Sequence, residues 1–491
     1  MRIYSKILLA VLVCLTVLNT AWAENSKDIV LKNGMRIFIK PMRAAPVVTL
    51  SYWVKNGSTY EEEHEEGFSE LVGKLLFASS VNYPDNSLRN ELTKLGVRYS
   101  RCSSNDCMAF TLTGSSSHLE HLLELGSEGF FNSIFSDDDL KKAIEATKKE
   151  IEATESRPEI LVNNIMIQKA ITTHPSRRPY YGLNPNFDGC NAFLLNRYYK
   201  KSYSPANSVL VITGDVDLEK AVELVKKNLE SIRSNNYAEP EFPKEPAQSE
   251  YREVVRYADL KKVYLSFGWK VPSVESSDIY AFYVVARLLG GDKNSLLWKK
   301  QVGGRETAEY ICASYASSRF GGLLMVNAVT TRSKLQYCID GVRKNIVDLV
   351  DEYISEETLE RIKNEIITED AFNCESIENC AIDYGSYAIM TEAIEADSFD
   401  NYIKAVNIED IKRVSAEYLR DEFLTVGILE SAPIPENALP MMYSLESGSK
   451  LILKENHKKG ECKKDGILEI IQKCNKNGKN FKQCPNCKVI I

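Results

Sequence analysis

The order of strand-like and helix-like segments repeats on either side of a linker, and this repeat limits the possible folds more than any other feature. Residues 236–250 contain three prolines and several charged side chains without an apolar period, which is typical of a linker between domains. On each side, alternating strand-like stretches and segments of helical period follow one another over roughly 200 residues. The sequence therefore predicts the α/β (α+β) class, with two similar domains that each combine a mixed sheet with helices.

In the first half, the dipeptide Asn33-Gly34 predicts a β-hairpin over residues 29–39, because its backbone favours the turn that joins two paired strands. The periodicity predicts further strands at residues 47–54, 95–99, 109–113 and 208–214, and helices at residues 67–80, 115–131, 137–154 and 218–232. In the second half we expect strands at residues 262–269, 308–313 and 321–329, and helices at residues 277–289 and 295–301.

The N-terminus has the three parts of a secretory signal peptide. Met1 to Lys6 is basic, Ile7 to Leu18 is apolar, and Ala21-Trp22-Ala23 is a small-x-small cleavage site. We therefore expect an exported protein, periplasmic or extracellular. The expected regions are a signal peptide at 1–23, an N-terminal domain at 24–235, the linker at 236–250, a C-terminal domain at 251–432 and a Lys- and Cys-rich extension at 433–491.

Hydropathy argues against a membrane-spanning segment, and charge argues against a nucleic-acid partner. No stretch after the signal peptide approaches the ~20 consecutive apolar residues of a membrane-spanning helix, so we expect no integral membrane span. The net charge is −7 and the body of the chain carries no basic stripe, so nothing indicates nucleic-acid binding.

One short helical segment, Gly67 to Ser80, carries a family signature. Following the strand at residues 47–54, it resembles the N-terminal signature of the pitrilysin/insulinase metallopeptidases, whose helix reads G-x-x-H-x-x-E-H-x-x-F. Glu70 and Lys74 occupy the positions of the two histidines, and Gly73 that of the glutamate. The resemblance implies that active relatives bind Zn²⁺ through both imidazoles and use the glutamate as general base. This helix retains the family spacing without that chemistry.

The same resemblance assigns the third zinc ligand of the family to Glu150, in the segment Lys149-Glu150-Ile151-Glu152-Ala153. Only one ligand position of three is retained, so we expect no cofactor. The resemblance extends from Asp28 to Ser431, which implies two homologous domains of the mitochondrial processing peptidase-like type.

A C-terminal run of the family contributes an Arg and a Tyr that reach the substrate carbonyl in active relatives. Tyr310 matches the Tyr, whereas Gly303 stands at the Arg position and Arg305 could replace it only after a slip in register. Tyr310 is equally compatible with a half-buried aromatic residue of a strand.

The resemblance implies a function in binding. We expect a non-catalytic homologue that pairs with an active insulinase-family peptidase subunit or with itself as a dimer. Extended peptides are the expected ligands, on the strand that carries Val97, Tyr99, Cys102 and Ser103, by backbone pairing that tolerates many side chains.

Two alternatives belong to other classes. An active zinc endopeptidase would need a rearranged metal site, for example Glu70 and Glu150 with the remote His64. An adaptor would bind an acidic surface through the Lys-rich extension. His118 and His121 share a helix face, but the apolar stripe beside them favours a solvated position rather than a metal site.

Cysteine use fits an oxidising compartment. Cys102 and Cys107 bracket one short segment, and Cys374 and Cys380 bracket another, so each pair is a candidate disulfide. The extension carries four further candidates, for which two disulfides are favoured over Zn²⁺: Cys462, Cys474, Cys484 and Cys487.

The last expectation concerns Lys74, whose charge we predict to occupy the position that the zinc ion has in active relatives. Glu70 precedes it by four residues on the same helix face, and the family fold would bring a buried Glu150 across to meet it. Lys74→Met should therefore destabilise the first domain, and Glu70→His, Gly73→Glu and Lys74→His should together create zinc affinity.

Overall fold

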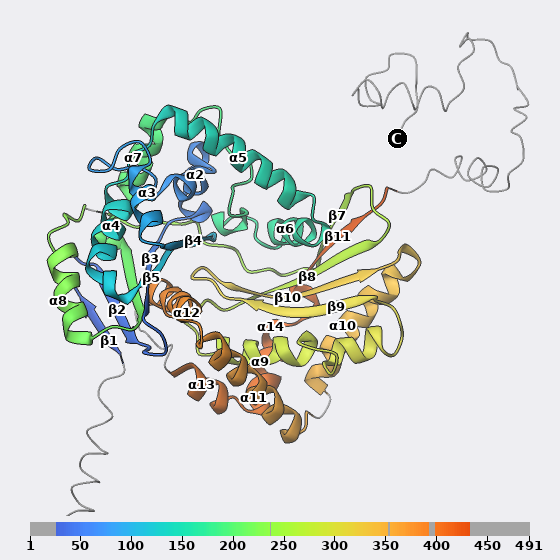
Figure 1. Cartoon of the computed structure of the whole chain (residues 1–491). Helices are drawn as coiled ribbons and strands as arrows, with labels where there is room; N and C mark the ends of the chain where they lie inside the picture. The colour runs from blue at the N-terminus through green and yellow to red at the C-terminus, as the bar shows by residue number, and fades with distance from the viewer. Residues whose placement is uncertain (1–25, 236, 352–353, 392–397, 433–491) are drawn as a thin grey trace, which may run out of the picture. The chain divides into compact units, whose positions relative to one another are not determined.

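The computed structural model describes residues 26–235, 237–351, 354–391 and 398–432, and their strands form two mixed sheets (Figure 1). The first sheet has the strand order β1-β2-β6-β3-β5-β4. Its strands are β1 Lys27–Val30, β2 Arg36–Pro41, β3 Val47–Val54, β4 Arg98–Ser103, β5 Met108–Ser115 and β6 Ser208–Gly214. The second has the order β7-β11-β8-β10-β9. Its strands are β7 Arg252–Tyr257, β8 Val263–Val271, β9 Tyr310–Ala316, β10 Gly322–Thr330 and β11 Leu424–Glu430.

Apart from β1, which has no counterpart in the second sheet, the two sheets share one topology. In each sheet a single parallel pair, β2 with β6 or β7 with β11, is followed by three antiparallel strands. The strand β4 ends the first sheet in the same way as β9 ends the second. The predicted fold class and the predicted repeat are therefore confirmed.

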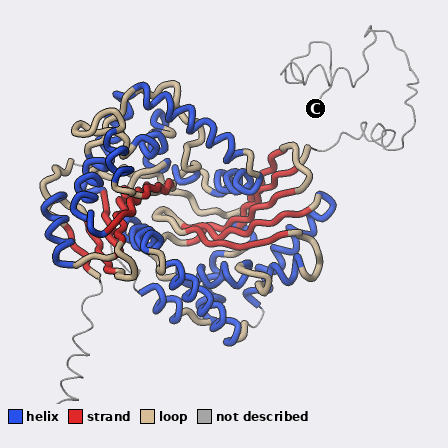
Figure 2. Tube along the Cα trace, viewed as in Figure 1, coloured by secondary structure: helices blue, strands red, loops and turns tan. Residues whose placement is uncertain are grey.

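Helices surround both sheets (Figure 2). The first half contributes α2 Phe68–Leu75, α3 Ser87–Lys94, α4 Leu119–Phe131, α5 Asp137–Glu155, α6 Pro158–Ala170, α7 Ala192–Ser202 and α8 Leu218–Leu229. The second half contributes α9 Ile279–Gly290, α10 Leu335–Asp351, α11 Glu356–Asn373, α12 Ile377–Met390, α13 Phe399–Ala405 and α14 Ile408–Tyr418.

Several boundaries differ from the sequence prediction. The helix expected to reach Ser80 ends at Leu75, because Leu76 is extended and Phe77 adopts a positive φ of 62°. The strand expected at residues 95–99 begins only at Arg98, after Gly96 turns the chain with φ 67°. The segment expected as a helix at 295–301 forms the π-helical turn η6, Trp298–Val302.

The sequence analysis did not predict α3, α6, α7 or any helix from α10 to α14. Two of these helices, α6 and α12, pack on the sheet of the other half. The α6 helix lies against β8 and β11, whereas α12 lies against β3 and β6. Close packing explains the glycine of α12, since a Cβ on Gly385 would lie 2.0 Å from Nε1 of Trp53. Helices buried against a partner sheet need no amphipathic stripe of their own, which removes the periodic signal. The domain boundaries at 235 and 250 remain predictions.

The linker is held by specific contacts along its length. The Glu245 carboxylate accepts hydrogen bonds from the backbone N–H groups of Thr172, Thr173 and His174 and pairs with Lys270. Burial opposes its charge, but these donors lower the pKa of Glu245 to about 2. The segment therefore anchors the first half to β8 of the second.

Beside this anchor, His174 is only 5% exposed, and its ring contacts Phe320 with the ring centroids 4.6 Å apart. Its Nδ1 accepts a hydrogen bond from the backbone N–H of Ser176, so that nitrogen cannot also carry a proton. Burial lowers the pKa of His174 below the ordinary 6.5, although Asp106 and Glu245 oppose the shift. The folded chain therefore favours the neutral imidazole.

Because His174 has a lowered pKa in the folded chain, we expect the protein to lose stability in acid. Below pH 6.5 the unfolded chain binds a proton that the folded chain rejects, so the free energy of unfolding should fall as the pH falls. His174→Asn keeps an acceptor for Ser176 without titrating, and should therefore lose less stability than the wild type as the pH falls below the ordinary pKa of 6.5. Urea unfolding at a series of pH values measures both, and parallel profiles would contradict the prediction.

The described cysteines are all free thiols in the structure: Cys102, Cys107, Cys190, Cys312, Cys338, Cys374 and Cys380. The thiols of Cys374 and Cys380 hydrogen-bond to each other, and burial raises the pKa of Cys107 to about 12. Both predicted local disulfides therefore stay predictions. The signal peptide at 1–23, the extension at 433–491 and its candidates Cys462, Cys474, Cys484 and Cys487 lie outside the described residues.

Candidate functional site

The α2 helix, which carries the degenerate signature, is fixed at its N-terminus by a buried carboxylate. Glu61 accepts hydrogen bonds from the backbone N–H groups of Gly67 and Ser69, at 2.9 and 2.8 Å, and from the Ser69 hydroxyl. Burial raises the pKa of Glu61 to about 7, although these donors oppose the shift. In its ionised form the carboxylate also matches the positive end of the helix dipole. The apolar face of α2 is buried in the first core: Phe68, Leu71, Val72 and Leu75. Glu70, Gly73 and Lys74 are left to face β4 and α5.

Four charged side chains meet beside α2, and we call them the charge cluster: Glu70, Lys74, Arg101 and Glu150. The guanidinium of Arg101 lies 2.6 Å from Oε1 of Glu70, and Lys74 Nζ lies 2.5 Å from Oε2 of Glu150. Lys74 is also 3.8 Å from Glu70, and Arg101 is 3.7 Å from Glu150. The cluster therefore alternates cation and carboxylate, as the sequence predicted for three of its members.

The exposure of the two carboxylates is the reverse of the prediction. The Glu150 side chain is 51% exposed, whereas that of Glu70 is 2% exposed. The expectation of a buried Glu150 was wrong, because the partly exposed α5 helix carries it at the rim of the site. The buried carboxylate, Glu70, is matched by Arg101 and by the Ser103 hydroxyl at 2.9 Å. We therefore expect the large loss of stability on removal of Arg101, and not on removal of Lys74.

The sequence analysis missed Arg101. Its side chain lies on the same face of β4 as Tyr99, since side chains alternate along a strand. Burial disfavours its charge, but the hydrogen bond that Arg101 donates to Glu70 and the negative charge of Glu70 outweigh this and raise the pKa of Arg101. The signal available in the sequence was the position of Arg101, a basic residue that shares a strand face with Tyr99 and Ser103.

Gly73 and Arg101 are sterically coupled. A Cβ built on Gly73 would lie 3.1 Å from Nη1 of Arg101 and 2.6 Å from Cε of Met108. The guanidinium therefore fills the space into which a glutamate at position 73 would project. In this packing arrangement the arginine at position 101 goes together with a residue without a side chain at position 73.

These residues do not fit Zn²⁺. Both carboxylates already accept from cationic donors, and a metal ion would face the positive charges of Lys74 and Arg101 at close range. Among the described residues, no group of three or more His, Cys, Asp or Glu side chains is arranged to hold a metal ion. His64, which the alternative zinc site would need, instead lies 3.6 Å from Glu62 on a separate short helix.

A pocket of 390 Å³ opens next to the charge cluster, between α2, α3, β4 and α5. It is lined by Gly73, Lys74, Phe77, Arg89, Leu92, Thr93, Val97, Tyr99, Arg101 and Glu150. Of the predicted peptide-binding residues, Val97 and Tyr99 line this pocket, and Ser103 lies on the same strand face. Cys102 lies on the opposite face and lines a different cavity of 410 Å³.

The predicted substrate residues of the second half lie elsewhere. Tyr310 begins β9, is 49% exposed, and packs its ring edge-on against Trp298. Arg305 lies in the turn after η6. Neither residue makes a recorded contact with the charge cluster among the described residues. On α4, the half-buried His121 pairs with Glu124 at 3.2 Å.

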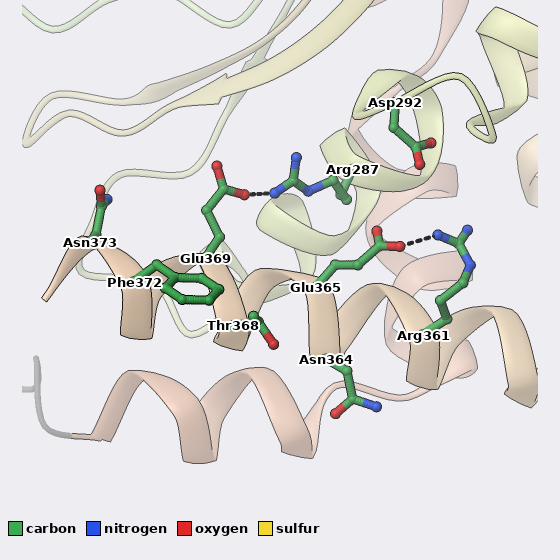
Figure 3. A pocket seen from close by; sticks show the side chains of 9 residues that line it. All are labelled: Arg287, Asp292, Arg361, Asn364, Glu365, Thr368, Glu369, Phe372 and Asn373. Carbon is green, nitrogen blue, oxygen red and sulfur yellow. Dashed lines mark hydrogen bonds and ion pairs between the residues drawn. The ribbon is translucent and has the colours of Figure 1, made fainter. Parts of the chain in front are cut away.

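A larger hollow of 760 Å³ lies on α9 and α11. The side chains that line it are drawn in Figure 3. Its charged side chains pair with each other, Arg287 with Glu369 and Arg361 with Glu365. None of its lining residues belongs to the charge cluster, and its two guanidiniums face the three carboxylates of Asp292, Glu365 and Glu369, which leaves one negative charge in excess. We therefore take the pocket beside α2 as the functional site.

Family models match most of the described chain. The insulinase family (peptidase family M16) matches residues 36–182, and the peptidase M16 inactive domain matches residues 192–366. The chain belongs to the insulinase family. Among the described residues of this insulinase-family chain, no helix combines the length and apolarity needed to cross a bilayer.

Relatives of this family member carry both enzyme and subunit names. The zinc protease PqqE of Helicobacter pylori is 22% identical over 84% of this chain and 94% of its own. Subunit 1 of the mitochondrial cytochrome b-c1 complex of Mus musculus is 24% identical over 44% of each chain.

Solved structures agree with the fold. A protease from Helicobacter pylori superposes with a TM-score of 0.77 at 22% identity, covering 83% of this chain and 99% of that one. The periplasmic protease PqqL from Escherichia coli has a TM-score of 0.70 at 15% identity, covering 90% of this chain and 52% of that one.

Proposed function

We propose that this protein is an exported, non-catalytic insulinase-family homologue that binds extended peptides. The observation that carries the proposal is the charge cluster, in which Lys74 and Arg101 stand among the side chains at the family's metal position. Zinc hydrolases need a bound metal to activate water, and a site with two fixed cations disfavours that metal. The site keeps the helix, the strand and a pocket, which are the parts that bind a substrate.

The open edge of β4 supports the binding role. Within the described residues β4 pairs only with β5, so its other side presents backbone donors and acceptors along the pocket. An extended peptide can add there as a further strand, which gives affinity with little dependence on sequence.

The partner in this proposal is a catalytic subunit of the same family or a second copy of this chain. A relative named as a subunit of the cytochrome b-c1 complex supports a subunit role. The signal-like N-terminus and the periplasmic protease among similar structures support export.

Hydrogen exchange tests the binding site. With an unfolded, carboxymethylated polypeptide at about ten times its Kd, amides of β4 should exchange about tenfold more slowly. The other edge strand of the first sheet, β1, should exchange at an unchanged rate. The same sample should contain no stoichiometric zinc and should leave the polypeptide intact.

Two results would refute the proposal. Unchanged exchange along β4 would mean that the edge is not used. Cleavage of the polypeptide together with stoichiometric zinc would identify an enzyme with rearranged ligands.

A further inference from the structure

The face of β4 that lines the pocket decides which side chains of a bound peptide enter it. Tyr99 and Arg101 lie on the α2 side of β4, whereas Arg98 and Cys102 lie on the other side. A strand added to the open edge would continue the sheet, so every second side chain of the peptide would point to the α2 side. One such side chain would enter the 390 Å³ pocket.

The pocket carries an excess of positive charge. Its cationic side chains are Lys74, Arg89 and Arg101, and the two carboxylates within reach are Glu70 and Glu150. Glu70 is buried behind Arg101, and Glu150 pairs with Lys74. One cation is therefore left over.

That cation is Arg89 on α3. Its guanidinium donates one hydrogen bond to the carbonyl of Leu76, at 3.3 Å, and lies 5.9 Å from the ring centre of Tyr99. Among the described residues it has no carboxylate within ion-pair distance. The other donors of the guanidinium fork therefore remain available at the pocket, held over an aromatic ring that limits the motion of the side chain.

The walls suit a short aliphatic chain that ends in an acid. Phe77 and Leu92 are buried apolar side chains, and Thr93 adds a hydroxyl on the same helix as Arg89. Methylene groups would contact the apolar wall while a terminal carboxylate meets the guanidinium, which presents paired N–H donors of matching geometry.

We propose that this pocket binds the carboxylate of an Asp or Glu side chain of the peptide, with Arg89 as the residue that selects it. The inference rests on the proposed binding of peptides to β4 and adds a preference to it. The protein would thus select extended segments with an acidic residue at one position and tolerate most residues elsewhere.

Two peptides that differ at one position test this preference. The probes are nine-residue, Thr- and Val-rich peptides with either Glu or Gln at the centre, titrated by fluorescence anisotropy, with β4 amide exchange as the second readout. We expect the Glu peptide to bind about tenfold more tightly, as for one added charge-assisted hydrogen bond. The preference should shrink at high ionic strength, because Arg89 is exposed to solvent.

Variants separate this inference from the proposed function. Arg89→Ala should bind both peptides equally, and Arg89→Glu should prefer the Gln peptide. The matched control, Arg197→Ala, removes an exposed arginine of α7 that does not line the pocket, and should keep the full preference. If both peptides protect β4 equally in the wild type, the acidic preference is wrong while peptide binding stands. If neither peptide protects β4, both proposals fail.

Discussion

Arg101→Met should lower the free energy of unfolding by about 3–5 kcal/mol, the usual cost of removing one partner of a buried ion pair. The reason is that Glu70, 2% exposed, would keep only the Ser103 hydroxyl and the more distant Lys74, at 3.8 Å. A carboxylate in that position cannot recover its lost hydration. Urea denaturation followed by circular dichroism measures the change.

A second substitution shows whether the stranded charge is the cause. Adding Glu70→Gln to Arg101→Met removes that charge and should recover much of the loss, because the two residues are in direct contact. Lys74→Met is the contrasting single variant. Its main partner, Glu150, is half exposed and can be hydrated by water, so the loss should be much smaller. Equal losses for Lys74→Met and Arg101→Met would contradict this ranking.

Zinc should bind more tightly to a variant with four substitutions than to one with three. Glu70→His, Gly73→Glu and Lys74→His rebuild the family's residues on α2. The new side chain at 73 would displace the flexible end of Met108, whose Cε lies 2.6 Å from the added Cβ, and would meet Arg101 Nη1 at 3.1 Å. The guanidinium would also repel the metal, by about 3 kcal/mol per unit charge at a separation near 5 Å and an effective dielectric constant near 20. Adding Arg101→Ala should therefore tighten zinc binding at least about tenfold. Competition with a fluorescent chelator measures both affinities.

A matched control uses the same strand. Arg98 lies on β4 but on the face opposite α2, where it pairs with Glu378. Adding Arg98→Ala to the three substitutions should leave the zinc affinity unchanged. If the triple variant binds zinc as tightly as the variant that also lacks Arg101, then Arg101 does not exclude the metal and this account of the site is wrong.

Much of the fold followed from local patterns. The Asn33-Gly34 hairpin and the strands at 47–54 and 208–214 were confirmed, because turn chemistry and a continuous apolar run are properties of neighbouring residues. Other helices were missed, and two of them, α6 and α12, each pack on a sheet from the other half, which a local pattern does not record.

The sequence by itself determined that α2 has Glu70, Gly73 and Lys74 where the family has its catalytic residues, because their spacing is fixed within one helix. Only the tertiary structure decided which charges meet there. The β4–β5 register brings Arg101, 31 positions beyond Glu70, onto the face of β4 that is turned toward α2, and the exposure of α5 leaves Glu150 at the rim. Burial and pairing across elements are set by strand register and helix packing, so the residue that replaces the metal could be recognised only in the folded chain.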